Sequence, residues 1–129
     1  MKIAARVRAW LPVAGWSGLI FFLSHQSLSA PQFNVFFSLD KLAHLGVYGI
    51  WGFLFARAVD KAGPPSWRAR TAFVVAAAAL LYGISDEFHQ AFIPHRTPSA
   101  ADVAMDVLGA FAGQWVYRRW NRPRCNQIR

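Results

Sequence analysis

Cysteine is nearly absent from this sequence, because Cys125 is the only one in 129 residues. A single cysteine excludes an internal disulfide framework and a cysteine-based zinc cluster. Charged residues are also scarce, at 16%, whereas a typical soluble domain has about 25%. Aromatic residues reach 16%, so the composition excludes an intrinsically disordered chain. The length predicts one domain over residues 1–129.

Acidic residues are few: six Asp and Glu stand against 14 Lys and Arg, and the net charge is +8. Such a balance occurs in proteins that bind nucleic acid and in proteins that lie at membranes. No basic run is interleaved with stacking aromatic residues outside the apolar stretches, so we expect no nucleic-acid partner.

The sequence also lacks a run of 20 uninterrupted apolar residues, the usual length of a bilayer span. Four apolar stretches reach that length when a few polar residues at one end are included; they cover about residues 7–24, 41–59, 70–92 and 101–120. They predict an all-α membrane protein with four transmembrane helices, and a small soluble helical bundle is the competing interpretation. The first stretch also resembles a signal peptide, but Pro31 disfavours cleavage after Ala30, so we expect it to be retained.

The cations alternate along the chain. All of the Lys and Arg residues except Lys41 and Arg96 lie at the beginning, between the second and third stretches, and in the final segment. Because cytoplasmic segments are enriched in cations, both termini are predicted to be cytoplasmic. The expected location is the bacterial cytoplasmic (inner) membrane, crossed several times, and residues 121–129 are expected to form a basic tail near anionic lipid.

The acidic residues are distributed in the opposite way. All except Asp60 lie at the predicted extracytoplasmic ends, as do the four histidines, of which His25 and His95 are expected to be exposed in loops. Ionisable groups below the membrane surface are costly unless they face the protein interior, water or one another. We therefore predict a polar cluster at the extracytoplasmic end of the second, third and fourth helices.

Four-residue spacing places these polar residues on one face of each helix. The three stripes are Asp40, His44 and Tyr48; Tyr82, Asp86 and Gln90, with His89 adjacent; and Asp102 with Asp106. The last stripe continues into Gly109 and Gly113, a small-xxx-small spacing that permits close helix packing. The three stripes are expected to face one outward-opening cavity.

A purely structural role is the alternative for each of these residues. Asp102, at the end of an S-x-x-D pattern, and Asp40 are candidate helix caps. Arg96 is a candidate partner of Asp86 or Glu87 in an ion pair that would lock a turn. The whole cluster would then be a structural hydrogen-bond network.

At these positions the sequence resembles the VanZ-like family of small bacterial membrane proteins. The matching segments are "DKLAHLGVYGIWGFLFARA" (40–58), "YGISDEFHQAFIPHR" (82–96) and "DVAMDVLGAFAG" (102–113), with "SHQS" after the first stretch. The family pattern often has Gly where this chain has His95 and Asn where it has Asp106. The resemblance implies an envelope-related role at the outer face of the membrane, by association with glycopeptide-antibiotic resistance, and no settled reaction.

The resemblance and the stripes together define the candidate ligand-binding residues. They are Asp40, Lys41, His44, Tyr48, Asp86, Gln90, Arg96, Asp102 and Asp106. The favoured function is binding of a lipid-linked envelope precursor or a phospholipid headgroup. Five acids against two cations disfavour a bare phosphate.

Two other functions stay open. One is an enzyme acting on a phosphorylated envelope lipid, with His44, Asp86, Glu87 and Asp106 as candidate catalytic residues. Arg96 and Lys41 would hold the phosphate, and a divalent cation on His44, Asp86 and Asp106 is the candidate cofactor. The other is a proton- or cation-linked transporter, because intramembrane carboxylates and histidines also form relays. The oligomeric state is not predicted.

Overall fold

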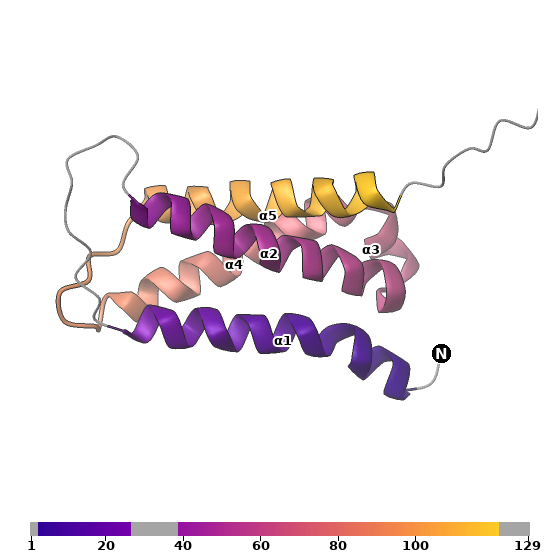
Figure 1. The fold of residues 1–129 in the computed structure, drawn as a ribbon, viewed down its shortest axis with the longest axis horizontal. Helices are drawn as coiled ribbons and strands as arrows, with labels where there is room; N and C mark the ends of the chain where they lie inside the picture. Colours follow the sequence, from indigo (N-terminus) through magenta and orange to yellow (C-terminus); the bar gives the residue numbers. More distant parts are fainter. Residues whose placement is uncertain (1–2, 27–38, 122–129) are drawn as a thin grey trace, which may run out of the picture.

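The computed structural model describes residues 3–26 and 39–121, and in these ranges it is all-α. The helices are α1 (Ile3–His25), α2 (Leu39–Ala62), α3 (Pro65–Ala69), α4 (Thr71–Gln90) and α5 (Ala100–Trp120) (Figure 1). The four predicted stretches overlap α1, α2, α4 and α5, whereas the short α3 follows Pro64 and was not predicted. The expected basic tail lies outside the described residues except for Asn121.

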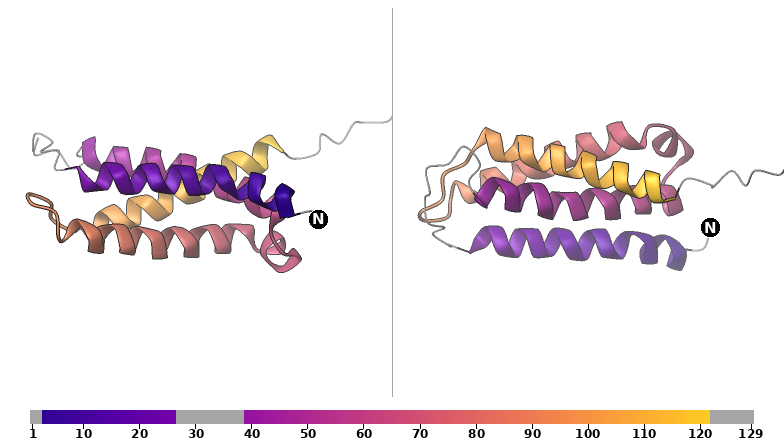
Figure 2. Two further views of the ribbon diagram at one scale, coloured as in Figure 1. Left: turned by 90° about the horizontal axis from the view of Figure 1, so that it is seen from below. Right: turned by 45° about the horizontal axis from the view of Figure 1, so that its top comes forward.

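The four long helices run up and down along the same axis. Figures 1 and 2 show α2 and α5 side by side and running in the same direction, with α4 and α1 running the opposite way. We call the end where α1 and α4 end and α2 and α5 begin the polar end (left in Figure 1). The opposite end is called the basic end, because most of the Lys and Arg residues of the helices lie there: Arg6, Arg8, Arg57, Lys61, Arg68, Arg118 and Arg119.

Glycines allow α2 and α5 to approach closely. A Cβ atom added at Gly113 would overlap the backbone of Gly49, and one at Gly109 would overlap the carbonyl of Leu45. A Cβ at Gly52 would overlap the backbone of Ala110. The predicted packing role of Gly109 and Gly113 is confirmed, and the glycines of α2 on the facing surface complete it.

An aromatic core joins α1 to α2 and α4. The rings of Trp51 and Tyr82 stack with centroids 6.0 Å apart and an interplanar angle of 8°. Both side chains donate to Ser17 of α1: Trp51 Nε1 to its hydroxyl at 2.9 Å, and the Tyr82 hydroxyl to its carbonyl at 2.6 Å. Trp16 Nε1 also donates to the carbonyl of Val47 at 2.9 Å. Three hydrogen bonds thus join α1 to α2 and α4, and the apolar sequence of α1 did not predict them.

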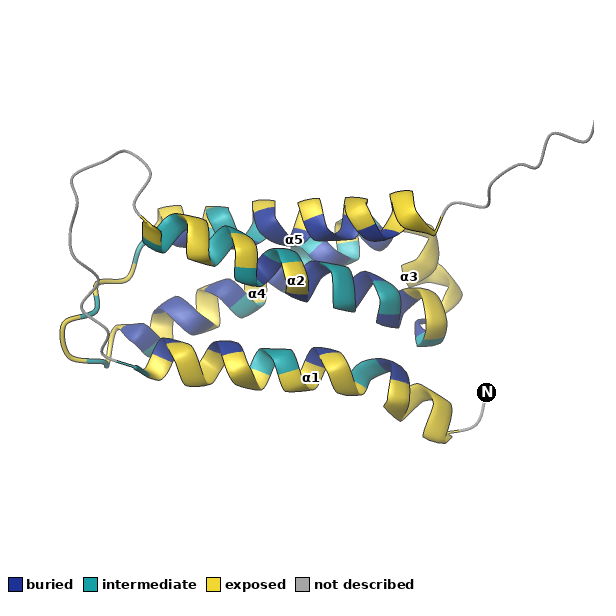
Figure 3. Ribbon diagram, in the orientation of Figure 1, coloured by how far each residue is buried: buried dark blue, intermediate teal, exposed yellow. Residues whose placement is uncertain are grey.

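The outer surface of the bundle is apolar. Figure 3 shows the buried residues on the inner faces of the helices, and large hydrophobic side chains such as Phe73, Leu81 and Phe88 are exposed. Soluble proteins rarely expose so much contiguous apolar surface. Three of the described helices, α1, α2 and α4, are long and apolar enough to cross a membrane, so the chain is a multi-pass membrane protein and not the soluble bundle.

The prediction of four membrane-spanning helices is wrong, because α5 is not apolar enough to qualify as a fourth. Asp102, Asp106 and Gln114 lower the mean hydropathy of this helix, and it does not qualify as a span by its own sequence. All three of these polar side chains are buried against the other helices, whereas Phe111 and Trp115 are exposed. These three polar side chains of α5 therefore face the bundle, and large apolar side chains face outward.

Candidate functional site

A cavity of about 320 Å³ lies at the polar end. Its apolar lining residues belong to α1 and α2 and are called the apolar wall: Ile20, Leu23, Leu39, Ala43 and Val47. Its polar lining residues are called the polar wall: Ser24, Asp40, His44, Tyr48, Asp86, Gln90 and Arg96. Most of the predicted ligand-binding residues therefore line this cavity, whereas Lys41, Asp102 and Asp106 do not. Asp106 bonds to the lining residue His44, and Lys41 pairs with Asp102.

Asp86 lies in the polar wall and is 4% exposed. Its Oδ2 atom accepts hydrogen bonds from the Ser24 hydroxyl at 2.8 Å and from Gln90 Nε2 at 3.1 Å. Its Oδ1 atom is buried and has no hydrogen-bond partner within residues 3–26 and 39–121. Ser24 belongs to the "SHQS" motif but was not predicted as a site residue, because a single serine at the end of an apolar stretch carries no charge or spacing signal.

His44 is held by Asp106 behind the cavity wall. His44 Nδ1 lies 2.8 Å from Asp106 Oδ1, and Asp106 is fully buried. A carboxylate only accepts, so Nδ1 donates, and Nε2 of a neutral ring keeps its lone pair for another partner. A Cβ atom on Gly83 would come within 2.8 Å of Asp106 Oδ2, so this glycine of α4 makes room for the carboxylate.

Two ion pairs lie at the polar end of α2. Lys41 Nζ is 3.2 Å from Asp102 Oδ1, and Arg96 Nη1 is 4.0 Å from Asp40 Oδ1. The first contact corrects the alternative in which Asp102 is a cap: the Ser99 cap makes no side-chain hydrogen bond, and Asp102 is buried. The second corrects the expected partner of Arg96, which is Asp40 on α2 and neither acid of α4.

Glu87 is set apart from the cavity. Its Oε2 atom accepts a hydrogen bond from the backbone N–H of Ser99 at 2.5 Å, and it does not line the cavity. This contact ties the end of α4 to the start of α5 and favours a structural role for this candidate catalytic residue. His25 and His95 are exposed as expected, although His25 Nδ1 lies 3.3 Å from His89 Nε2.

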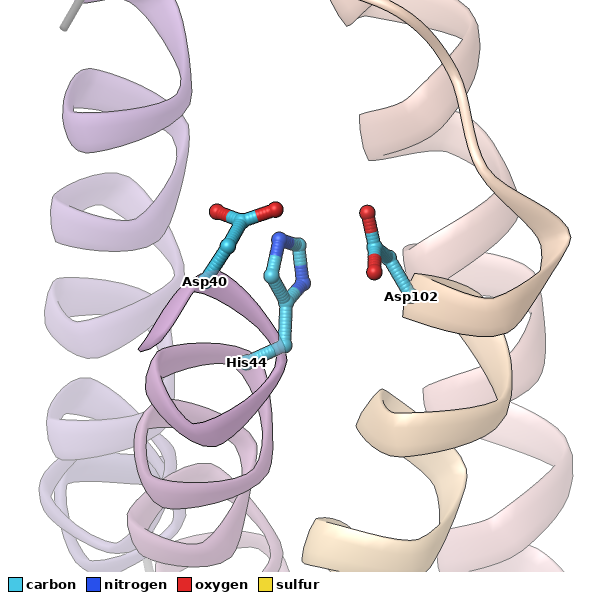
Figure 4. A group of neighbouring side chains, drawn as sticks. All are labelled: Asp40, His44 and Asp102. Atoms are coloured by element: carbon cyan, nitrogen blue, oxygen red, sulfur yellow. The ribbon is translucent and has the colours of Figure 1, made fainter. Parts of the chain in front are cut away.

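Asp40, His44 and Asp102 converge in a way that suits a cation. Each offers one ligand atom, and these atoms lie within 4.8 Å of one another (Figure 4). Carboxylate and imidazole ligands fit several divalent cations, and the Asp106 carboxylate behind His44 provides the second hydrogen bond that ligating histidines usually make. The predicted ligand set, His44, Asp86 and Asp106, shares only His44 with this group. Asp86 bonds to Gln90, and Asp106 bonds to His44 itself.

The turn between α4 and α5 has a left-handed backbone at His95, with φ of 67°. This conformation is unfavourable for residues other than Gly, Asn and Asp. The family that the sequence resembles often has Gly at this position, and the observed φ supplies the physical reason. The next residue is Arg96, so the turn sets the direction from which its side chain reaches the cavity.

Comparison with known proteins identifies the family. No curated protein and no solved structure matches the chain. The VanZ/LLP1 family matches over residues 6–121, a range that includes α2, α4 and α5 entirely and with them every residue of the polar wall. This match confirms the resemblance seen in the sequence motifs. The chain is a member of the VanZ/LLP1 family.

Proposed function

We propose that the protein binds the headgroup of a lipid or lipid-linked envelope precursor in the cavity at the polar end. The observation that carries this proposal is that the cavity is lined by both apolar and polar side chains. An amphipathic ligand needs a polar surface for its headgroup and an apolar surface for its glycerol and first methylene groups. Leu23 and Leu39 of the apolar wall are themselves exposed, so this wall continues onto the lipid-facing surface.

The proposed orientation places the polar end outside the cytoplasm of a bacterial cell. Cations at the basic end favour this orientation, as does the up-and-down order of the helices. We propose that α5 lies in the bilayer with the other helices although its average composition is polar. Its exposed face is apolar, and its aspartates meet Lys41 and His44 of α2. Retention of α1 is favoured because Ser24 completes the polar wall.

Charge favours binding of an amine-containing ligand over a bare phosphate. The polar wall has two carboxylates, Asp40 and Asp86, against the single cation Arg96. Arg96 already faces Asp40 at 4.0 Å, which leaves Asp86 without an opposite charge among its hydrogen-bond partners. A phosphate alone would add negative charge to this wall.

Blocking the cavity tests the proposal. Ala43 lines the apolar wall, so Ala43→Trp should fill it and reduce the lipid that stays bound to purified protein, measured by native mass spectrometry in mild detergent. Ala104→Trp is the matched control, because Ala104 is exposed on α5 and does not line the cavity. Equal lipid retention in the two variants would contradict the proposal.

A second candidate is an enzyme acting on a phosphorylated lipid with a divalent cation at Asp40, His44 and Asp102. The convergence of these ligand atoms favours it. The cation would have to displace Lys41 from Asp102 and Arg96 from Asp40, and the two released cations would then be available for a phosphate.

Metal binding tests this candidate. Titration with Mg²⁺, Mn²⁺ or Zn²⁺ should raise the unfolding temperature of the protein, and Asp102→Asn should abolish the rise. Asp60→Asn is the control, because Asp60 bonds to Tyr117 and lies at the basic end. Absence of any shift at millimolar metal would exclude the metal-assisted enzyme.

A further inference from the structure

The polar wall of the cavity contains three buried polar atoms that have no partner within the part of the chain that the structure describes. They are the Tyr48 hydroxyl, Asp86 Oδ1 and Arg96 Nε. Tyr48 is 1% exposed and Asp86 is 4% exposed, so both side chains are more than nine-tenths buried. Buried polar groups in proteins are almost always hydrogen-bonded. All three atoms belong to residues that line one cavity, so an occupant that enters between these side chains would supply the missing partners.

The three atoms differ in what they require. Asp86 Oδ1 belongs to a carboxylate and accepts, whereas Arg96 Nε–H only donates. The Tyr48 hydroxyl does either. A complementary ligand must therefore present an N–H or O–H donor to Asp86 and a hydrogen-bond acceptor to Arg96. Charge complementarity makes these a cationic donor and an anionic acceptor, because hydrogen bonds between oppositely charged groups are the strongest.

We infer that the cavity selects a headgroup in which a primary ammonium and a phosphate are joined by a short linker, as in phosphoethanolamine. The ammonium donates to Asp86 Oδ1 and to the Tyr48 hydroxyl, and a phosphate oxygen accepts from Arg96 Nε. This inference rests on the proposed function, since it names the ligand class of the same cavity.

The same atoms predict which headgroups are rejected. A choline headgroup has the same charges, but its trimethylammonium has no N–H, so Asp86 Oδ1 would stay without a donor. A glycerol headgroup has hydroxyl donors but no positive charge opposite Asp86. A site that is built to bond a polar hydrogen discriminates strongly against a ligand that lacks it, because its own groups are left unpaired.

A competition experiment tests the inference on the full-length protein. Detergent-purified protein receives equal amounts of phosphatidylethanolamine, phosphatidylcholine and phosphatidylglycerol with identical acyl chains, and bound lipid is measured by native mass spectrometry. We expect the ethanolamine lipid to bind about tenfold more tightly than either competitor. Asp86→Asn, which keeps the shape of the side chain, should reduce this preference severalfold, and Asp60→Asn should leave it unchanged.

The outcomes separate this inference from the proposed function. If all three lipids bind alike and Ala43→Trp still lowers their retention, the cavity binds lipid without this selectivity and the inference fails alone. If no lipid binding depends on Ala43, the proposed function fails as well. Soluble phosphoethanolamine is added in a separate arm: competition by it at the same concentration would assign the site to a free headgroup, and its failure to compete would assign the site to the lipid. Both assignments apply only when the ethanolamine lipid binds more tightly than its two competitors.

Discussion

Replacing Tyr48 by phenylalanine separates a ligand-binding role from a structural one. The Tyr48 ring is buried and packs against both Trp51 and Tyr82, with centroids 6.2 Å and 6.0 Å away. Its hydroxyl has no partner among the residues that the structure describes. The variant keeps the ring and removes only an oxygen that bonds to none of these residues, so the packing of the core should be preserved.

The expected magnitudes come from the cost of an unmade hydrogen bond. Leaving a buried hydroxyl unsatisfied costs about 1–3 kcal/mol, so Tyr48→Phe should raise the free energy of unfolding by about the same amount. The same hydroxyl bonds to the ligand, and a hydrogen bond of about 0.5–1.5 kcal/mol corresponds to a loss of about twofold to tenfold in affinity for the ethanolamine lipid.

Tyr82→Phe is the matched control on the neighbouring ring. Its hydroxyl donates to the Ser17 carbonyl at 2.6 Å, and the residue does not line the cavity. Removing this bond should lower the free energy of unfolding by about 0.6 kcal/mol, the average for interhelical hydrogen bonds in a membrane protein. Lipid affinity should not change. The two variants are thus expected to have opposite effects on stability and unequal effects on binding.

Both quantities are measurable on the same samples. Unfolding in mixed detergent, followed by tryptophan fluorescence, gives the stability difference, and native mass spectrometry with the ethanolamine lipid gives the affinity difference. A loss of stability in Tyr48→Phe as large as in Tyr82→Phe would show that the Tyr48 hydroxyl has a partner within the protein. The reasoning from unpartnered atoms would then be refuted.

Three further predictions concern packing, orientation and the turn before α5. Gly113→Ala should destabilise the protein by about 1–3 kcal/mol in denaturant unfolding, because its Cβ would overlap the backbone of α2. The control Gly18→Ala, whose added Cβ meets nothing within 4 Å, should stabilise the protein by up to about 1 kcal/mol. Equal effects of the two substitutions would contradict the close packing of α2 and α5. With the native cysteine replaced by serine, a membrane-impermeant thiol reagent should label exposed Thr97→Cys in intact cells and leave Ser66→Cys at the basic end unlabelled; the reverse pattern would invert the proposed orientation. His95→Gly should stabilise the protein by about 0.5–1 kcal/mol because φ is 67°, whereas a loss of stability would assign a contact to the imidazole.

Much of the fold and part of the site follow from the sequence alone. Apolar stretches separated by basic or proline-containing segments predict the long helices, and i, i+4 spacing brings Asp40, His44 and Tyr48 onto the face that lines the cavity. Asp86 and Gln90 of α4 converge on the same wall. The family motifs add Arg96, which lies in a turn, where helical spacing makes no prediction.

The remaining features depend on which helix lies opposite which residue. Ser17 and Ser24 of α1 bond to Tyr82 and Asp86, but a serine within an apolar stretch has no periodic signal that names its partner. Mean hydropathy likewise averages over the whole circumference of α5, so it could not separate the buried Asp106 from the exposed Phe111. The pairing of Arg96 with Asp40 was missed because nearness in sequence favoured the acids of α4.

The burial of the α5 aspartates also constrains how the protein is made. An aspartate at the centre of an isolated transmembrane helix opposes membrane insertion by about 2.5–3.5 kcal/mol, and α5 carries Asp106 in its first half as well as Asp102 in its first turn. Their partners, Lys41 and His44, lie on α2, which is synthesised earlier. In the proposed arrangement, with α5 in the bilayer, this helix depends on α2 for a stable place there. Loss of the α2 partners should then appear first as failed assembly of newly made chains and their removal by membrane proteases.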